Sequence, residues 1–166
     1  MIIIGYPGVG KSSICGSNNS TIDLESSMFH TGDEPHGWES IYCRVAADLS
    51  KQGYKVCISS HATVIDEIKQ HLKGDRVYIV YPDPIIKQDW IDRLEKRYFE
   101  SRTDVSTPHW IVEKNYRAWK HVEKYFDMDI FSLKHSGIEN VREIIINDID
   151  LYNLNQMIND CEELMG

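Results

Sequence analysis

The sequence predicts an α/β fold in three layers, with a five-stranded parallel sheet covered by helices on both faces. Two observations predict it. Short apolar runs rich in β-branched residues alternate along the chain with segments of helical periodicity, and strands joined by helices form parallel sheets buried on both faces. The 166 residues also suffice for one sizeable core, so we expect a single domain spanning 1–166.

In the first half of the chain, apolar runs predict the strands, and apolar residues at helical spacing predict the helices. Gly53 and Gly74 are expected to end two of the helices. The breaker-rich stretch 16–20 should end the first helix early. The expected strands are 2–4, 21–23 and 54–59, and the expected helices are 11–16, 37–50 and 64–72.

In the second half, an apolar strand is stopped by Pro82 and Pro84, and two long helical patterns flank a polar, turn-rich stretch at 102–108. A fifth strand is expected after the second of these helices, and the chain should then be mostly helical to its end. The expected strands are 76–81 and 129–133, and the expected helices are 85–100, 109–126 and most of 138–166.

The most informative motif follows the first strand directly. Residues 5–12 read Gly-Tyr-Pro-Gly-Val-Gly-Lys-Ser, a complete G-x-x-x-x-G-K-[ST] phosphate-binding loop. Glycines allow successive backbone N–H groups to point inward around a phosphate, Lys11 reaches the β- and γ-phosphates, and the Ser12 hydroxyl ligates Mg²⁺. The residues expected to hold a nucleotide are Gly5, Pro7, Gly8, Val9, Gly10, Lys11, Ser12 and Ser13.

An acidic segment follows the second predicted strand. Asp23 and Glu25 flank the end of that strand, and ligands of open α/β sheets bind outside the carboxyl ends of strands. A carboxylate there can hold Mg²⁺ together with Ser12, contact the acceptor, or accept a proton from an attacking hydroxyl. We therefore expect Asp23 in the metal site and both acids near the substrate. The alternative is that Asp23 and Ser26 only cap the next helix.

The third predicted strand ends in Ser59, Ser60 and His61, where phosphate-loop proteins commonly carry an aspartate on the magnesium side. No acid stands here, which raises the importance of Asp23. Ser59 and His61 are candidates for hydrogen bonds to a substrate or an attacking water. The alternative for His61 is a plain helix-start residue.

An arginine-rich segment follows the fourth predicted strand. Arg93, Arg97 and Arg102 lie on a helix and its end without an obvious role in the core. Arginine neutralises charge on a transferring phosphoryl group and grips phosphate oxygens in a bidentate manner. We expect Arg93 and Arg97 to be catalytic, Arg102 to contact substrate, and 93–108 to contain a lid. The alternative is a solvated helix face paired with its own glutamates.

Charge and cysteine content limit the possible partners. The net charge of −8 argues against a broad basic face for duplex nucleic acid, without excluding nucleic acid altogether. The four cysteines lie far apart with no C-x-x-C pair, which argues against a zinc site. Without a signal-like or long apolar segment, we expect a reduced, cytoplasmic protein that does not enter a membrane.

Two groups of aromatic residues remain. Trp110, Tyr116, Trp119 and Tyr125 have helical spacing and are expected mostly in the core. The stretch 30–37, flanked by aromatic side chains, is a flexible-loop candidate that would fold over a base or another planar substrate group.

The loop Gly5–Ser12, the acidic step at Asp23 and the Arg93/Arg97 helix occur in an order that resembles the small P-loop kinases of the nucleoside monophosphate kinase and shikimate kinase group. The chain is also similar to phage-encoded nucleotide kinases. The resemblance covers most of residues 1–133, while the missing acid after the third strand and the short first helix depart from it.

The resemblance implies a P-loop NTPase fold and a phosphotransferase that moves the γ-phosphoryl group of ATP, with Mg²⁺, to a small acceptor. A (deoxy)nucleoside monophosphate fits the surplus of arginines best. Two alternatives stay open: a kinase for a nucleoside, a sugar or a base or end in DNA, and an ATPase or nucleotide-dependent switch.

Overall fold

The computed structural model describes residues 1–17, 19–30, 37–150 and 152–164, in which strands and helices alternate. The strands are β1 (Ile2–Gly5), β2 (Thr21–Asp23), β3 (Lys55–Ser59), β4 (Val77–Pro82) and β5 (Val141–Ile146). The helices are α1 (Lys11–Ser17), α2 (Trp38–Lys51), α3 (Ala62–His71), α4 (Lys87–Thr103), α5 (His109–Lys134) and α6 (Leu154–Glu163). Short 3₁₀ turns span Ser26–Met28 and Pro84–Ile86.

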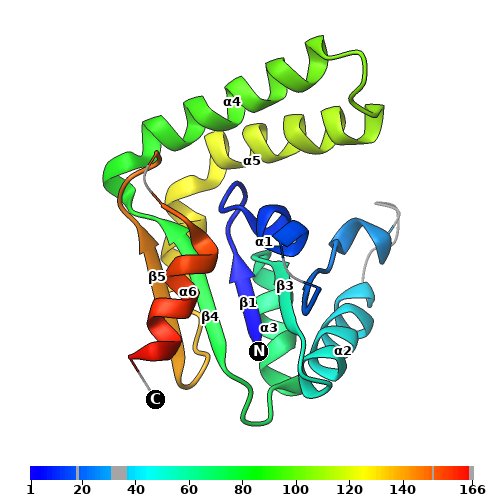
Figure 1. Ribbon diagram of the computed structural model, residues 1–166, viewed down its shortest axis with the longest axis vertical. Coiled ribbons are helices and arrows are strands. Elements are labelled where there is room, and N and C mark those ends of the chain that lie inside the picture. The colour runs from blue at the N-terminus through cyan, green and yellow to red at the C-terminus, as the bar shows by residue number, and fades with distance from the viewer. Residues whose placement is uncertain (18, 31–36, 151, 165–166) are drawn as a thin grey trace.

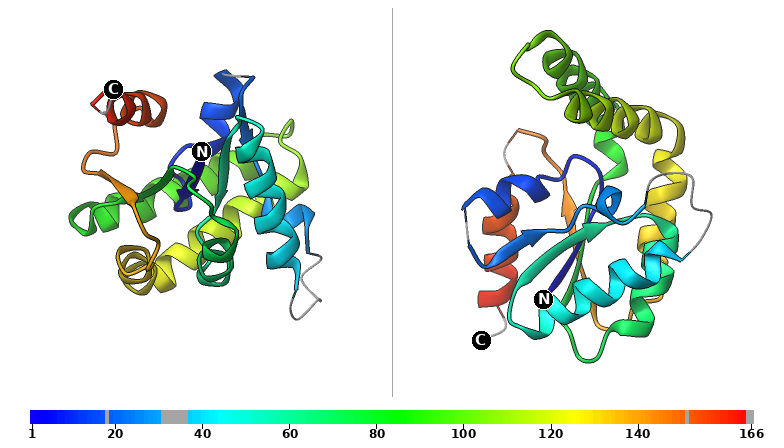
Figure 2. Two further views of the ribbon diagram at one scale, coloured as in Figure 1. Left: turned by 90° about the horizontal axis from the view of Figure 1, so that it is seen from below. Right: turned by 90° about the vertical axis from the view of Figure 1, so that its right-hand side faces the viewer.

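The five strands form one parallel sheet in the order β2-β3-β1-β4-β5. Helices α1 and α6 cover one face, and α2, α3 and the second half of α5 cover the other (Figures 1 and 2). The prediction of a three-layer α/β fold with a five-stranded parallel sheet is confirmed.

Strand β1 lies at the centre of the sheet, between β3 and β4. After β1 the chain builds β2 and β3 on one side, and then crosses to build β4 and β5 on the other. The chain order therefore reverses at the carboxyl end of β1, which is the position where open α/β sheets bind ligands. The loop that follows β1 occupies this position.

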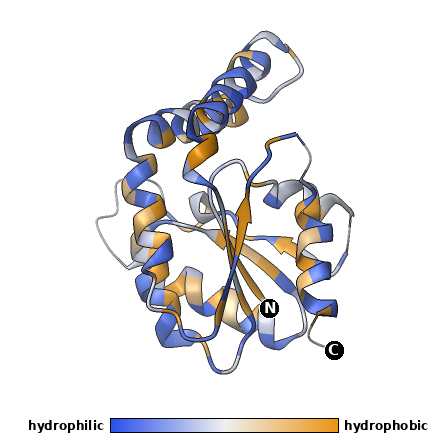
Figure 3. Cartoon of the chain, turned by 90° about the vertical axis from the view of Figure 1, so that its left-hand side faces the viewer, coloured by the Kyte–Doolittle hydropathy of each residue, from blue (hydrophilic) through white to orange (hydrophobic). Residues whose placement is uncertain are grey.

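The core lies along the central strands. Ile2, Ile3 and Ile4 of β1 are fully buried, as are the apolar residues of β3 and β4, which explains their continuous apolar runs. Figure 3 shows these strands among the most hydrophobic parts of the fold, while the helices mix hydrophilic and hydrophobic residues. This rigid sheet fixes the loops at its carboxyl edge.

The predicted fifth strand is wrong in position. Residues 129–133 belong to α5, because Phe126, Ile130 and Leu133 continue the helical spacing of buried residues. The fifth strand is Val141–Ile146, which pairs with β4. The segment 138–166 is consequently not mostly helical, since α6 is its one helix within the described residues.

The lid candidate is a helical hairpin rather than a loop. Helix α4 runs to Thr103, three residues past its predicted end, and a short turn leads to α5. The first half of α5 lies against α4 above the sheet, and α5 then bends so that its second half descends behind the sheet (Figures 1 and 2). The hairpin thus extends out from the edge that carries the loop after β1.

None of the described helices combines the length and the apolar character needed to cross a bilayer.

Candidate phosphate-binding site

The loop between β1 and α1 has the backbone conformation that its glycines allow. Gly8 and Gly10 have φ of 90° and 94°, which other residues rarely adopt. A Cβ on Gly5 would lie 2.9 Å from carbon atoms of both Lys11 and Val9, so only glycine fits where the loop leaves the strand. The glycine spacing of the motif is therefore required by this loop's geometry.

Two aromatic side chains from distant parts of the chain hold the loop. The Trp90 indole Nε1 donates to the Pro7 carbonyl at 2.9 Å, and the Tyr152 hydroxyl donates to the Gly8 carbonyl at 3.1 Å. The two rings stack at 6.1 Å between centroids. Helix α4 and the segment before α6 thus fix two carbonyls of the loop, while the Tyr6 and Val9 N–H groups donate to the carbonyls of Val80 and Tyr6.

Lys11 begins α1, and its ammonium donates to the Gly5 carbonyl at 2.6 Å across the loop. Loss of hydration lowers the pKa of Lys11, while the negative charge of Asp23 opposes this shift. An anion placed in the loop would add to the negative charge of Asp23 and so offset more of this desolvation cost.

Ser12 and Asp23 are brought together, as the sequence predicts. The Ser12 hydroxyl donates to Asp23 Oδ2 at 2.9 Å, linking the first turn of α1 to the end of β2. Ser13 lies in the same turn with an exposed side chain, and its N–H donates to the Gly10 carbonyl at 3.0 Å. A hydroxyl and a carboxylate at hydrogen-bond distance offer two adjacent oxygen ligands.

This pair fits magnesium better than a metal that needs a full protein cage. Mg²⁺ takes one or two protein oxygens and completes its shell with waters and substrate phosphates. Among the described residues, no group of three or more His, Cys, Asp or Glu side chains is arranged to hold a metal. A hydroxyl and a carboxylate are oxygen ligands of the kind that Mg²⁺ takes from proteins.

Glu25 lies near the same site but is paired. Its carboxylate forms an ion pair with Lys114 of α5. Sequence reasoning missed Lys114, because nothing in the local pattern of α5 distinguishes it from the other charged residues on that helix. The pair bridges the acidic segment after β2 to the helical hairpin.

The arginines separate into two groups. The Arg93 guanidinium lies 5.4 Å from the Trp90 ring centroid and 5.3 Å from that of Tyr152, and it donates to the Tyr152 hydroxyl at 2.9 Å. Loss of hydration and the nearby charge of Arg93 lower the pKa of Arg97, and the charge of Glu25 opposes this. Arg93 and Arg97 therefore lie on the side of α4 that faces Tyr152, one of the two residues that hold the phosphate loop.

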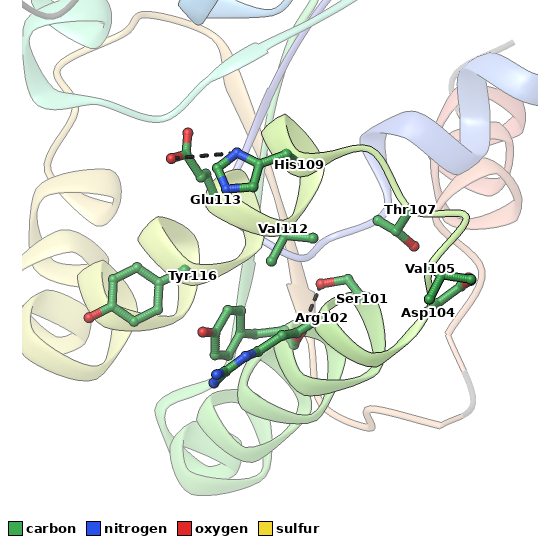
Figure 4. Close-up of a pocket in the computed structure, with 10 residues that line it drawn as sticks. Ser101, Arg102, Asp104, Val105, Thr107, His109, Val112, Glu113 and Tyr116 are labelled. Atoms are coloured by element: carbon green, nitrogen blue, oxygen red, sulfur yellow. Dashed lines mark hydrogen bonds and ion pairs between the residues drawn. The ribbon is translucent and has the colours of Figure 1, made fainter.

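Arg102 lies elsewhere. It lines a hollow of about 600 Å³ near the tip of the hairpin, between the end of α4 and the start of α5 (Figure 4). An α-helix rises about 1.5 Å per residue, so Arg102 is about 12 Å farther along α4 than Leu94, which touches the loop at Gly8. The structure does not bring Arg102 to the phosphate loop.

The exposure of the hairpin corrects one expectation about its aromatic residues. Trp119 is buried, Tyr125 is half-buried, and Trp110 and Tyr116 are 60% and 45% exposed, so the expectation that most of the four lie in the core is wrong. Trp110 and Tyr116 both lie in the first half of α5, which packs against α4 in the hairpin rather than on the sheet.

Ser59 and His61 stand beside the loop. Ser59 ends β3 directly opposite Gly5 in the parallel register, and its hydroxyl accepts a hydrogen bond from the His61 backbone N–H at 3.3 Å. His61 precedes α3, and its side chain makes no capping bond to that helix. Loss of hydration lowers the pKa of His61, and the charges of His121, Lys11 and His30 add to this while Asp129 opposes it.

A cluster on α5 completes the surroundings of the loop. Asp129 Oδ2 lies 2.7 Å from His121 Nε2 and accepts a hydrogen bond from the Tyr6 hydroxyl at 3.2 Å. The His121 ring meets the His61 ring edge to face, with centroids 6.3 Å apart. Burial and the charge of Asp129 raise the pKa of Tyr6, so this phenol remains a hydrogen-bond donor.

Sequence reasoning missed this cluster because it assigned Asp129 to a strand. In a straight helix, eight residues separate His121 and Asp129 by about 12 Å along the axis. Their contact requires the bend of α5, for which no proline or glycine gives a signal in the sequence.

Residues 31–36, which include most of the loop predicted to cover a planar substrate group, lie outside the described residues.

Comparison with known proteins leaves the family open. No protein-family model matches the chain, and no curated protein matches it significantly.

Proposed function

We propose that this protein is a P-loop phosphotransferase that moves the γ-phosphoryl group of Mg-ATP to a small acceptor. The observation that supports this most is the complete loop Gly5–Ser12 at the carboxyl end of the central strand, with the Ser12–Asp23 pair beside it. Loop, cation, hydroxyl and carboxylate are the parts that phosphoryl transfer uses for positioning and charge neutralisation.

The loop residues hold the donor phosphates. Their backbone N–H groups and Lys11 cradle the β- and γ-phosphates in place of the Gly5 carbonyl that Lys11 contacts here. Ser12 and Asp23 would hold Mg²⁺, which would supply positive charge next to the phosphate oxygens. Arg93 and Arg97 approach from α4 and stabilise charge on the transferring group.

The acceptor binds between the acidic segment after β2, the end of β3 and the hairpin. Arg97 and Lys114 bring positive charge to this side of the loop, next to Glu25. A nucleotide-sized acceptor that carries a phosphate suits these cations, so nucleoside monophosphates are the first acceptors to examine.

The test measures ADP formation from Mg-ATP over a panel of ribo- and deoxynucleoside monophosphates, nucleosides and small hydroxy acids. We expect one acceptor class to stimulate ADP formation in the wild type, and Lys11→Ala to abolish the stimulation. Acceptor-independent hydrolysis alone would support an ATPase or switch instead. Retained activity in Lys11→Ala would overturn the assignment of the loop.

A further inference from the structure

We propose that His61 accepts a proton from the acceptor, and that the attacking atom is consequently a hydroxyl oxygen. His121, Asp129 and Tyr6 form the positioning group beside it. The proposal rests on the phosphotransferase function above and identifies the acceptor chemistry of the same site.

The first reason is that the two nearby carboxylates are already engaged. Asp23 accepts the hydrogen bond of Ser12, and Glu25 is paired with Lys114. Each of these carboxylates is therefore positioned by a partner on α1 or α5. A group without such a partner is better placed to take a proton from an attacking hydroxyl.

The second reason is the place and freedom of His61. Ser59 pairs in register with Gly5, and adjacent strands lie about 4.8 Å apart, so the residues just after Ser59 border the loop. The His61 side chain caps no helix, and its ring contacts the His121 ring but makes no hydrogen bond to a described residue. A structural role does not account for this imidazole.

The third reason is the charge around His61. Lys11 on α1, His121 on α5 and His30 after the first 3₁₀ turn place cationic or protonatable groups around it, and Asp129 is the acidic group that opposes them. Together with lost hydration, these groups lower the pKa of His61. The ring is therefore neutral at neutral pH, the form that can accept a proton.

The fourth reason is that the neighbouring cluster fixes the ring that His61 meets. Asp129 holds His121 by a 2.7 Å contact and is itself held by the hydroxyl of Tyr6, a residue of the phosphate loop. The His61 and His121 rings stand at 85° to each other. The position of His61 is in this way coupled to the loop that carries the donor.

The transfer step balances as follows. The acceptor oxygen forms a bond to the γ-phosphorus while the bond from that phosphorus to the bridging oxygen breaks, and the electron pair leaves with ADP. The hydroxyl proton passes to the imidazole nitrogen of His61 and then to solvent. A phosphate oxygen as acceptor would need no base, because a phosphate monoester has already lost most of its second proton at pH 7.

The chemical bond in the product is the first test. Transfer from Mg-ATP to a nucleoside, or to a nucleoside monophosphate through its free hydroxyl, gives a phosphate ester, which ³¹P NMR distinguishes from the phosphoanhydride of a nucleoside diphosphate. We expect the ester. A phosphoanhydride product would overturn the proposal while supporting the phosphotransferase function.

The second test is His61→Gln, with His71→Gln at the last residue of α3, the helix that His61 precedes, as the matched control. We expect kcat to fall by about 10²- to 10⁴-fold in His61→Gln, with Mg-ATP affinity unchanged and with the acid limb of the pH profile lost. His71→Gln should behave as the wild type. Unchanged kcat and an unchanged pH profile in a folded His61→Gln protein would overturn the proposal.

Water provides a version of the test that needs no identified acceptor. Water is also a hydroxyl nucleophile, so slow ATP hydrolysis that depends on Lys11 should fall in His61→Gln and show the same loss of its acid limb. Hydrolysis that requires Lys11 but not His61 would overturn this proposal alone. ADP formation independent of Lys11 would overturn the proposed function itself.

Discussion

The Ser12 hydroxyl donates a hydrogen bond to Asp23 Oδ2 at 2.9 Å, across the gap between the first helix and the edge strand β2. This contact brings the acidic segment at Asp23 next to the glycine-rich loop Gly5–Ser12. It also gives the Ser12 hydroxyl an acidic partner from β2, whereas the adjacent strand β3 ends in Ser59 without an acid.

Asp23→Asn should therefore weaken the response to magnesium. The asparagine amide keeps an acceptor for the Ser12 hydroxyl but removes the negative charge of Asp23. Loss of a residue that holds or orients a metal ligand costs about 10- to 100-fold in metal affinity or activity. The measurement is the Mg²⁺ titration of ADP formation. Asp66→Asn is the control, since Asp66 lies on the exposed face of α3. A titration in which Asp23→Asn matches the wild type would contradict the assignment of Asp23 to the metal site.

Gly5→Ala should destabilise the fold through the loop. The new methyl group would overlap Lys11 and Val9 at 2.9 Å, and overpacking of this kind costs about 1–3 kcal/mol. At about 2–4 °C per kcal/mol for a chain of this size, thermal unfolding should shift down measurably. Gly16→Ala is the control, because no atom lies within 4 Å of its Cβ, and it should be neutral or slightly stabilising. Equal melting temperatures in the two variants would refute the packing argument.

Tyr152→Phe should loosen the loop without disturbing the core. It removes the hydroxyl that donates to the Gly8 carbonyl and accepts from Arg93, while the stacked ring remains. We expect a loss of about 0.5–1.5 kcal/mol in unfolding free energy and a raised KM for ATP. Tyr54→Phe serves for comparison, since its hydroxyl makes no hydrogen bond to a described residue. An unaltered KM in Tyr152→Phe would show that the loop is held by other contacts.

Arg97→Ala and Arg102→Ala should differ sharply. Arg97 lies near Glu25 and Arg93, whereas Arg102 lines the hollow near the tip of the hairpin. Removal of an arginine that stabilises phosphoryl transfer costs about 10³-fold or more in kcat. Steady-state kinetics should therefore show a large loss for Arg97→Ala and a change within about twofold for Arg102→Ala. The reverse order would move the acceptor site to the tip of the hairpin.

Much of the fold is readable from the sequence, because buried parallel strands are continuous apolar runs and glycines mark the turns. The fifth strand was misplaced for a physical reason. Ile144 and Ile146 are buried but Ile145 and Glu143 are exposed, so this edge strand alternates and looks weaker than a central strand. The buried spacing through Leu133 meanwhile continues a helix.

The sequence predicts those site residues that follow one another in the chain, but not those that only the tertiary structure brings together. The eight residues of the loop follow one another in the chain, so the motif alone locates them. Lys114, His121 and Asp129 reach the site only because α5 folds back over α4 and then bends, and no local pattern specifies that path.

The most direct test of the central claim needs no knowledge of the acceptor. Isothermal titration calorimetry measures Mg-ATP binding to the wild type and to Lys11→Ala, with circular dichroism confirming that both are folded. We predict saturable, magnesium-dependent binding by the wild type and at least a tenfold loss of affinity in the variant. Equal affinity, or no binding by the folded wild type, would contradict the assignment of Gly5–Ser12 as a nucleotide phosphate site.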